Sequence, residues 1–148
     1  MNPMGDLVPK SQRYHGLGNL IVAASLVALG VWIARRRAFL MAVKGDSMEP
    51  ILSEGDFLVA MRGGTIGHGS LVVVEHPDRP DYEMVKRVTA VPGDRVEERG
   101  LRPGEFWVTG DNPTGSTDSR SFGPVTRGAI KGVVRARYWP VSRVRLFG

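Results

Sequence analysis

Residues 71–91 read LVVVEHPDRPDYEMVKRVTAV. Two apolar runs rich in β-branched residues, 71–74 and 84–91, lie on either side of a segment that holds two prolines. Runs of this length with such residues favour β-strands, and the prolines between them favour a turn. The stretch therefore predicts two strands of one sheet.

Similar short apolar runs occur on both sides of this stretch. They are residues 39–43, 57–61, 106–109 and 133–139. Turn-forming clusters separate them, and the chain contains 19 glycines and 10 prolines in 148 residues. This spacing is typical of a mainly β domain, so residues 38–148 are predicted to form one compact antiparallel sheet or partly open barrel. A chain of this length has room for one such domain.

Composition excludes several kinds of chemistry. There is no cysteine, which rules out disulfides, thiolate metal sites and cysteine nucleophiles. The three histidines, His15, His68 and His76, show no spacing that would place two on one helix face. We expect them to be ordinary surface residues, and we predict no metal site.

Charge is distributed in blocks along the chain. Residues 1–44 carry six basic and one acidic side chain, residues 45–119 carry seven and fourteen, and residues 120–148 carry seven and none. The net charge of +5 thus comes from two basic ends around an acidic centre. A protein that binds nucleic acid along one face has a more uniform basic surface, so no nucleic-acid partner is expected.

An apolar segment lies near the N-terminus. Residues 17–34 contain no charged side chain, and eighteen residues of helix span about 27 Å, close to the thickness of the bilayer core. We predict a single transmembrane anchor here, preceded by a tail of residues 1–16. A buried core helix, a cleaved signal peptide and an interfacial helix are the alternatives. The arginines at 35–37 favour a cytoplasmic location for the remainder.

A serine in a tight turn is the first candidate for chemistry. The turn reads GDSMEP over residues 45–50, so Ser47 lies between a flexible glycine and a proline. Such a turn can expose the hydroxyl and point its own backbone N–H at a bound carbonyl, as acyl transfer requires. Most turns of this composition have no catalytic role.

A lysine on an apolar strand face is the second candidate. Alternation along residues 83–88 places Lys86 on the same face as Met84 and Val88. A lysine in this position either extends to solvent or is desolvated, and desolvation lowers its pKa so that the amine can accept a proton.

A polar loop at residues 110–124 is the third. Its sequence, GDNPTGSTDSRSFGP, is rich in short side chains that hydrogen-bond to their own backbone and make irregular loops rigid. It is either an ordered loop without a role or a support for the site. In the second case Ser116 would orient a neutral lysine, while Asp118 and Arg120 would pair and hold the loop.

These segments together resemble the type I signal peptidases, which are serine proteases with a Ser/Lys dyad. GDSMEP is similar to that family's nucleophile box, VKRVTAVPGD to its lysine box and GDNPTGSTDSRSFGPV to its last conserved loop. The resemblance implies Ser47 as nucleophile, Lys86 as general base and Ser116 as the hydroxyl that positions it, with no cofactor. It also implies that Met48 lines the site, and that Gly45 replaces an oxyanion serine that some members have.

The substrate implied by the resemblance is a precursor protein that loses an N-terminal leader or propeptide. Within the family, the short chain, His76-Pro77 and the loop after residue 110 are similar to the branch that matures nickel-type superoxide dismutase. A catalytic domain on the cytoplasmic side of the membrane, as the arginines at 35–37 indicate, would suit that branch. The alternative is a general type I signal peptidase acting on exported proteins.

Two other classes remain open from the residues alone. One is a self-cleaving repressor or polymerase accessory subunit, which uses the same Ser/Lys chemistry but has no apolar anchor. The other is a membrane-tethered module whose basic C-terminal stretch contacts lipid head groups or RNA. That stretch comprises Lys131, Arg135, Arg137, Arg143 and Arg145 around Tyr138 and Trp139. Its ordinary interpretation is an edge strand with outward-facing arginines.

Overall fold

The computed structural model describes residues 12–148, apart from the side chains of residues 12–18, 34 and 36. Most of the predicted tail, and the side chain of His15, therefore lie outside the described residues. The chain divides into two units, residues 1–36 and 37–148.

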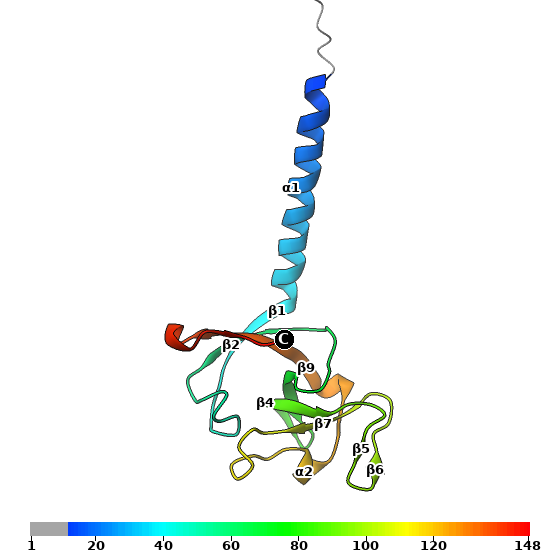
Figure 1. The fold of residues 1–148 in the computed structure, drawn as a ribbon, viewed down its shortest axis with the longest axis vertical. Helices are drawn as coiled ribbons and strands as arrows, with labels where there is room; N and C mark the ends of the chain where they lie inside the picture. The colour runs from blue at the N-terminus through cyan, green and yellow to red at the C-terminus, as the bar shows by residue number, and fades with distance from the viewer. Residues whose placement is uncertain (1–11) are drawn as a thin grey trace, which may run out of the picture. The chain divides into compact units, whose positions relative to one another are not determined.

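The first unit contains helix α1, Gln12–Arg37, which includes the whole predicted apolar segment (Figure 1). Its large apolar side chains are exposed, among them Leu20, Leu26 and Val27. Within the described residues, however, no helix has the length and apolarity needed to cross a membrane. The helix is confirmed, and the transmembrane anchor stays a prediction.

The second unit is mainly β, as predicted. All six predicted strand segments lie on strands of the structure. The strands are β1 Ala38–Ala42, β2 Phe57–Met61, β3 Leu71–His76, β4 Arg79–Ala90, β7 Glu105–Thr109 and β9 Ile130–Trp139.

The remaining elements are short and were not predicted. They are the strands β5 Arg95–Val96, β6 Arg99–Gly100, β8 Val125–Thr126 and β10 Arg145–Leu146, the helix α2 Ser119–Phe122, and the 3-10 turns η1 Arg127–Ala129 and η2 Val141–Arg143. The strands β5 and β6 pair only with each other and form a separate hairpin (Figure 1).

The main sheet is antiparallel and has the strand order β1-β2-β9-β3-β4-β7-β8, with β10 added beside β9. Within the described residues its end strands, β1 and β8, do not pair with each other, so the sheet is open. Strands distant in sequence become neighbours, since β9 pairs with both β2 and β3. This order places β4, which carries Lys86, next to the buried strand β3.

The hydrophobic core lies on both faces of the sheet, and β3 joins its two parts. Val73 packs into one buried cluster with Met48 and Leu52, while Val72 packs into the other with Val88. Successive residues of a strand point to opposite faces, so a strand buried on both sides is apolar at every position. This is why the valine run of β3 shows no alternation.

The expectation of an edge strand with outward-facing arginines is wrong for Arg137, whereas Arg145 on β10 is exposed as expected. Strand β9 lies inside the sheet, and Arg137 is only 6% exposed. Its Nη1 donates to the Asp56 carboxylate at 2.8 Å and to the Ile51 carbonyl at 2.8 Å, and its Nε donates to the Arg143 carbonyl at 2.6 Å. Because Asp56 is 1% exposed, both charges of the pair are removed from water, and a buried arginine needs such partners.

The histidines also differ from expectation in one case. His68 is an exposed surface residue, as expected, and its Nε2 lies 2.6 Å from the Asp94 carboxylate. His76 is instead 8% exposed, and its ring contacts the rings of Tyr82 and Phe122 in edge-on geometry. Its Nδ1 accepts a hydrogen bond from the backbone N–H of Asp78 at 3.1 Å.

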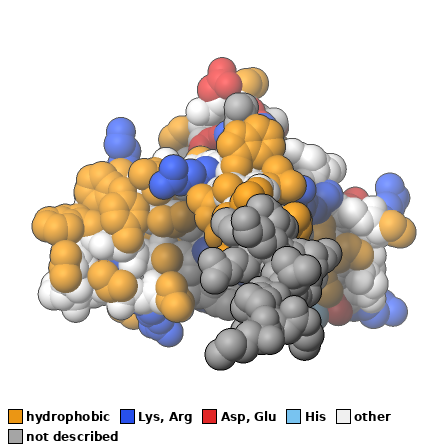
Figure 2. Space-filling model, turned by 90° about the horizontal axis from the view of Figure 1, so that it is seen from above, with side chains coloured by type: hydrophobic (Ala, Val, Ile, Leu, Met, Phe, Trp, Pro, Cys, Tyr) orange, Lys and Arg blue, Asp and Glu red, His pale blue; other side chains and the backbone are white. Residues whose placement is uncertain are grey.

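Apolar side chains gather on the surface at the C-terminal end of the sheet. Trp139, Val141, Val144 and Leu146 are each exposed. Figure 2 shows hydrophobic side chains concentrated on the left of the view, the side on which the C-terminal segment lies in Figure 1. We call these four residues the C-terminal apolar surface.

Candidate active site

The turn that carries Ser47 follows directly after β1. Gly45 has φ +76°, a left-handed conformation that glycine adopts without the steric cost of a side chain. Val43 anchors the start of the turn, because its N–H donates to the Asp56 carbonyl and its carbonyl accepts from the Gly55 N–H. Met48 is buried in the core just after Ser47. The chain thus holds Ser47, which is half-buried, between a fixed strand end and a packed side chain.

Lys86 lies on the buried face of β4, as predicted, with Met84 and Val88 in the core on either side of it. Its side chain is among the most buried polar groups of the described residues, at 2% exposure. Lys86 Nζ donates a hydrogen bond to Ser116 Oγ at 3.0 Å. Burial lowers the pKa of Lys86, and the Arg120 charge lowers it further, while the Asp118 charge acts in the opposite direction.

Asp118 is the centre of a hydrogen-bond network behind Ser116. Its Oδ2 accepts from Ser116 Oγ at 2.7 Å and from the Gly110 N–H at 2.9 Å. Arg120 donates to the same carboxylate through Nε at 2.9 Å and Nη2 at 2.6 Å. Burial raises the pKa of Asp118, but these hydrogen bonds outweigh burial and hold the pKa well below its usual range. The predicted pair of Asp118 and Arg120 is therefore present.

Two residues join the polar loop to the serine turn, and sequence reasoning did not single them out. The Asn112 N–H donates to the Ser47 carbonyl at 3.0 Å, and Asn112 Nδ2 donates to the Asp46 carbonyl at 3.3 Å. Gly110 lies so close to both segments that a Cβ atom there would meet the Ser47 carbonyl oxygen at 2.5 Å and overlap Ser116 Oγ. A glycine in a polar loop is common, so only the fold could show this close approach.

A second ion pair, also missed from the sequence, fixes the start of the loop. Arg87 follows Lys86 on β4 and points to the opposite face. It binds the Asp111 carboxylate through two hydrogen bonds of 2.7 Å, and its Nη1 donates to the Gly69 carbonyl at 2.9 Å. Bidentate arginine–carboxylate pairs constrain orientation as well as distance. Residues on both faces of β4 therefore contact the same loop.

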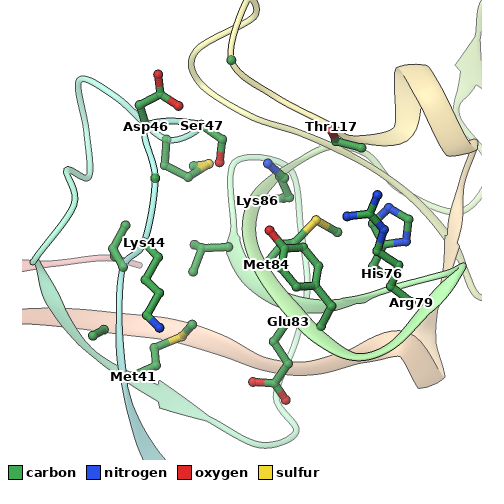
Figure 3. A pocket seen from close by; sticks show the side chains of 17 residues that line it. Met41, Lys44, Asp46, Ser47, His76, Arg79, Glu83, Met84, Lys86 and Thr117 are labelled. Carbon is green, nitrogen blue, oxygen red and sulfur yellow. The ribbon is translucent and has the colours of Figure 1, made fainter.

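These segments surround a cavity of about 320 Å³. Figure 3 shows the Ser47 hydroxyl and the Lys86 amine pointing toward one another at one side of it. Met41 and Lys44 lie toward one end of the cavity, and His76 and Arg79 lie together toward the other. Met48 and Gly45 also line the cavity.

Among the described residues, Ser47 has two groups without a hydrogen-bond partner: its hydroxyl and its backbone N–H. Lys86 Nζ donates to Ser116 instead of contacting Ser47 through a hydrogen bond. In active sites without a bound ligand such contacts are often longer than in the complex. Nothing in the part of the chain that the structure describes gathers three or more metal-binding side chains.

The family of the chain follows from comparison with known proteins. The model of the signal peptidase family, peptidase S26, matches residues 15–102 and 97–139. The chain belongs to this family. The predicted resemblance to signal peptidases is confirmed.

Individual relatives are subunits of mitochondrial proteases. Mitochondrial inner membrane protease subunit 1 of Xenopus tropicalis is 34% identical over 112 residues, which cover 66% of this chain and 67% of that protein. Subunit 2 of Danio rerio is 31% identical over 133 residues, covering 79% and 73%. The Arabidopsis thaliana mitochondrial ATP-independent inner membrane protease subunit 1a is 36% identical over 115 residues, covering 66% and 68%.

Proposed function

We propose that this protein is a serine endopeptidase that cleaves precursor proteins with Ser47 as nucleophile and Lys86 as general base. The observation that carries the proposal is the burial of Lys86 beside Ser47 at one cavity. A buried lysine with a single neutral hydrogen-bond partner, Ser116, is held in conditions that favour its uncharged form. Membership of a peptidase family supports the same assignment.

The first half of the reaction forms an acyl-enzyme. The neutral amine of Lys86 takes the proton of Ser47 Oγ as that oxygen attacks the scissile carbonyl carbon. The tetrahedral intermediate collapses, the C–N bond breaks, and the Lys86 ammonium gives its proton to the departing amine. Ser116 directs the amine throughout, because its hydroxyl donates to Asp118 and so presents a lone pair to Lys86 Nζ.

The second half restores the enzyme. Lys86 accepts a proton from a water molecule that attacks the acyl ester, and the serine oxygen recovers its proton when the ester breaks. The unpartnered backbone N–H of Ser47 is placed to stabilise the oxyanion in both halves. Gly45 supplies no hydroxyl, so this N–H is the oxyanion donor that we assign among the described residues.

The substrate that we propose is a precursor with an N-terminal leader or propeptide. The relatives are named as inner membrane proteases, and their names give no support to the narrower prediction of nickel-type superoxide dismutase maturation. General cleavage of signal peptides and dedicated maturation of one precursor use the same dyad. We therefore propose precursor processing as the activity.

We also propose that the protein associates with a membrane. The relatives carry the inner membrane in their names, and both units of this chain expose apolar side chains. In the first unit these lie along α1, and in the second they form the C-terminal apolar surface. Membrane fractionation of the expressed wild type and of a variant that lacks α1 tests the predicted single-pass anchor. The wild type should resist extraction with alkaline carbonate, and the variant without α1 should lose this resistance.

Ser47→Ala and Lys86→Ala test the dyad directly. Each should abolish peptide cleavage while the thermal unfolding midpoint of the purified protein stays near that of the wild type, because neither group is needed for the sheet. Ser70→Ala is the matched control and should retain activity, because Ser70 is half-buried like Ser47 but does not line the cavity. Substantial cleavage by the Lys86 variant would contradict the assignment of the base.

Comparison of protein N-termini between cells carrying the wild type and cells carrying Ser47→Ala then identifies the substrates. One precursor that keeps its leader, such as a nickel-type superoxide dismutase, would show dedicated maturation. Many exported proteins that keep their leaders would show a general signal peptidase. An unchanged set of N-termini would count against a role in precursor processing.

A further inference from the structure

A second cavity lies beside the catalytic one. Its volume is about 300 Å³, similar to that of the first and at the lower end of the range for ligand pockets in proteins. It lies between the turn after β3 and the segment that holds β8 and η1. Nothing in the proposed reaction requires it.

The lining of this cavity is suited to apolar side chains. Three prolines, Pro77, Pro80 and Pro124, contribute to it together with Val125 and Ala129. Prolines have no backbone N–H, so the proline part of this wall offers no donor to an added strand. It offers instead a surface on which an apolar side chain can be buried.

The one acidic group in the lining is already paired. Glu75 forms an ion pair with Lys131, and this contact holds the pKa of Glu75 below its usual value. Its charge is therefore offset by a neighbouring cation. The chemistry of the cavity is set by its prolines and aliphatic side chains.

His76 belongs to the walls of both cavities, so the two adjoin at this residue. Its ring is held by Phe122, with ring centres 5.3 Å apart, and by Tyr82 at 6.1 Å. Arg79, the cross-strand partner of His76, lines the catalytic cavity at the same end (Figure 3). A chain bound at Ser47 and running toward Arg79 would approach the residue that the two cavities share.

We propose that the second cavity is an accessory subsite, which binds an apolar side chain of the precursor at a distance from the scissile bond. The occupant is the substrate chain itself, because the cavity adjoins the catalytic one through a shared residue. This inference rests on the proposed peptidase function. Such a subsite would let the enzyme select precursors by a residue that lies away from the cleaved bond.

A randomised peptide library tests the subsite. Peptides of about twenty residues, when extended, reach well beyond one cavity. Cleavage by the purified full chain, followed by sequencing of the products, gives the residue preference at each position relative to the bond. The variant Thr126→Trp places a large ring at an exposed residue that lines the second cavity. Thr89→Trp, at an exposed strand position outside both cavities, is the matched control.

We expect an apolar preference at one position several residues from the bond. A peptide that carries this residue should have a KM about tenfold lower than a version truncated before it, because burial of one apolar side chain contributes about that factor or more. Thr126→Trp should remove the difference between the two peptides and leave kcat/KM for the truncated one unchanged. Thr89→Trp should leave both values as in the wild type.

The outcomes separate this inference from the function on which it rests. Equal KM for long and truncated peptides in the wild type would overturn the subsite while leaving the peptidase intact. So would a Thr126→Trp enzyme that still prefers the long peptide. Activity on the truncated peptide serves as the measure of folding for each variant. Failure of the wild type to cleave any peptide would refute the proposed function itself.

Discussion

Replacing Gly110 by alanine should damage the site while leaving the sheet in place. The added Cβ atom would lie 2.5 Å from the Ser47 carbonyl oxygen and would overlap Ser116 Oγ. Contacts of a Cβ atom closer than 3.0 Å are essentially never seen in real structures. The Ser47 carbonyl must therefore retreat by about 0.5 Å or more, and the Ser116 side chain must move as well.

The expected magnitude follows from what moves. The Ser47 carbonyl accepts from the Asn112 N–H at 3.0 Å, so the nucleophile turn and the polar loop shift together. A displacement of about 1 Å between reacting groups costs about 100-fold in rate. We expect kcat/KM of Gly110→Ala to fall about 10- to 100-fold, which is about 1.4 to 2.7 kcal/mol of transition-state stabilisation. Overpacking should also lower the free energy of unfolding by about 1 to 3 kcal/mol.

Peptide cleavage under conditions where each variant is fully folded gives the comparison. Gly67→Ala is the matched control, because a Cβ atom there has nothing within 4 Å and the backbone is not left-handed. This control should keep wild-type kcat/KM. If Gly110→Ala, once shown to be folded, also kept kcat/KM within about twofold of the wild type, the close approach would not position the site.

Three further predictions concern the base and the buried charges. Ser116→Ala removes the hydrogen-bond acceptor of Lys86 and should lower kcat about tenfold or more without abolishing cleavage, while Ser116→Thr should recover most of it. Wild-type kcat/KM should rise with pH along a limb below the ordinary lysine range, because burial lowers the pKa of Lys86 and only the neutral amine accepts a proton; Arg120→Gln should move this limb to higher pH. Arg137→Met leaves the buried Asp56 carboxylate with one cation fewer and should lower the free energy of unfolding by about 3 kcal/mol in denaturant titration. Arg135→Met, at a half-buried position of the same strand, is the control and should change the free energy of unfolding by less than about 0.5 kcal/mol.

The long strands could be predicted from sequence because five or more consecutive residues carry a readable pattern. Short strands such as β5 and β8 contain only two residues, and two residues show no readable pattern. Arg137 shows why burial is harder to predict. Arginines at alternate positions of a strand are expected to face solvent, and the partner of Arg137, Asp56, is 81 residues away in the chain. A carboxylate that distant leaves no local signal.

The site was predictable in part for the same reason. Lys86 could be placed on an apolar face by alternation alone, and the structure finds it buried there. The roles that we propose for Ser47 and Ser116 came from the order of several motifs, which a single motif could not have indicated. The contacts of Gly110 and Asn112 depend on how the polar loop approaches the serine turn, and that approach is a property of the fold.

An ion pair behind Ser116 suits a lysine base better than a lone carboxylate would. A charged carboxylate close to Lys86 raises the pKa of the amine and so favours the protonated form, which cannot act as a base. Here Arg120 binds the Asp118 carboxylate through Nε and Nη2, and its own charge lowers the pKa of Lys86. Asp118 can therefore orient the Ser116 hydroxyl while the Arg120 charge opposes the effect of its own charge on the lysine. On this reasoning the amine contacts a neutral hydroxyl because direct contact with the carboxylate would keep it charged.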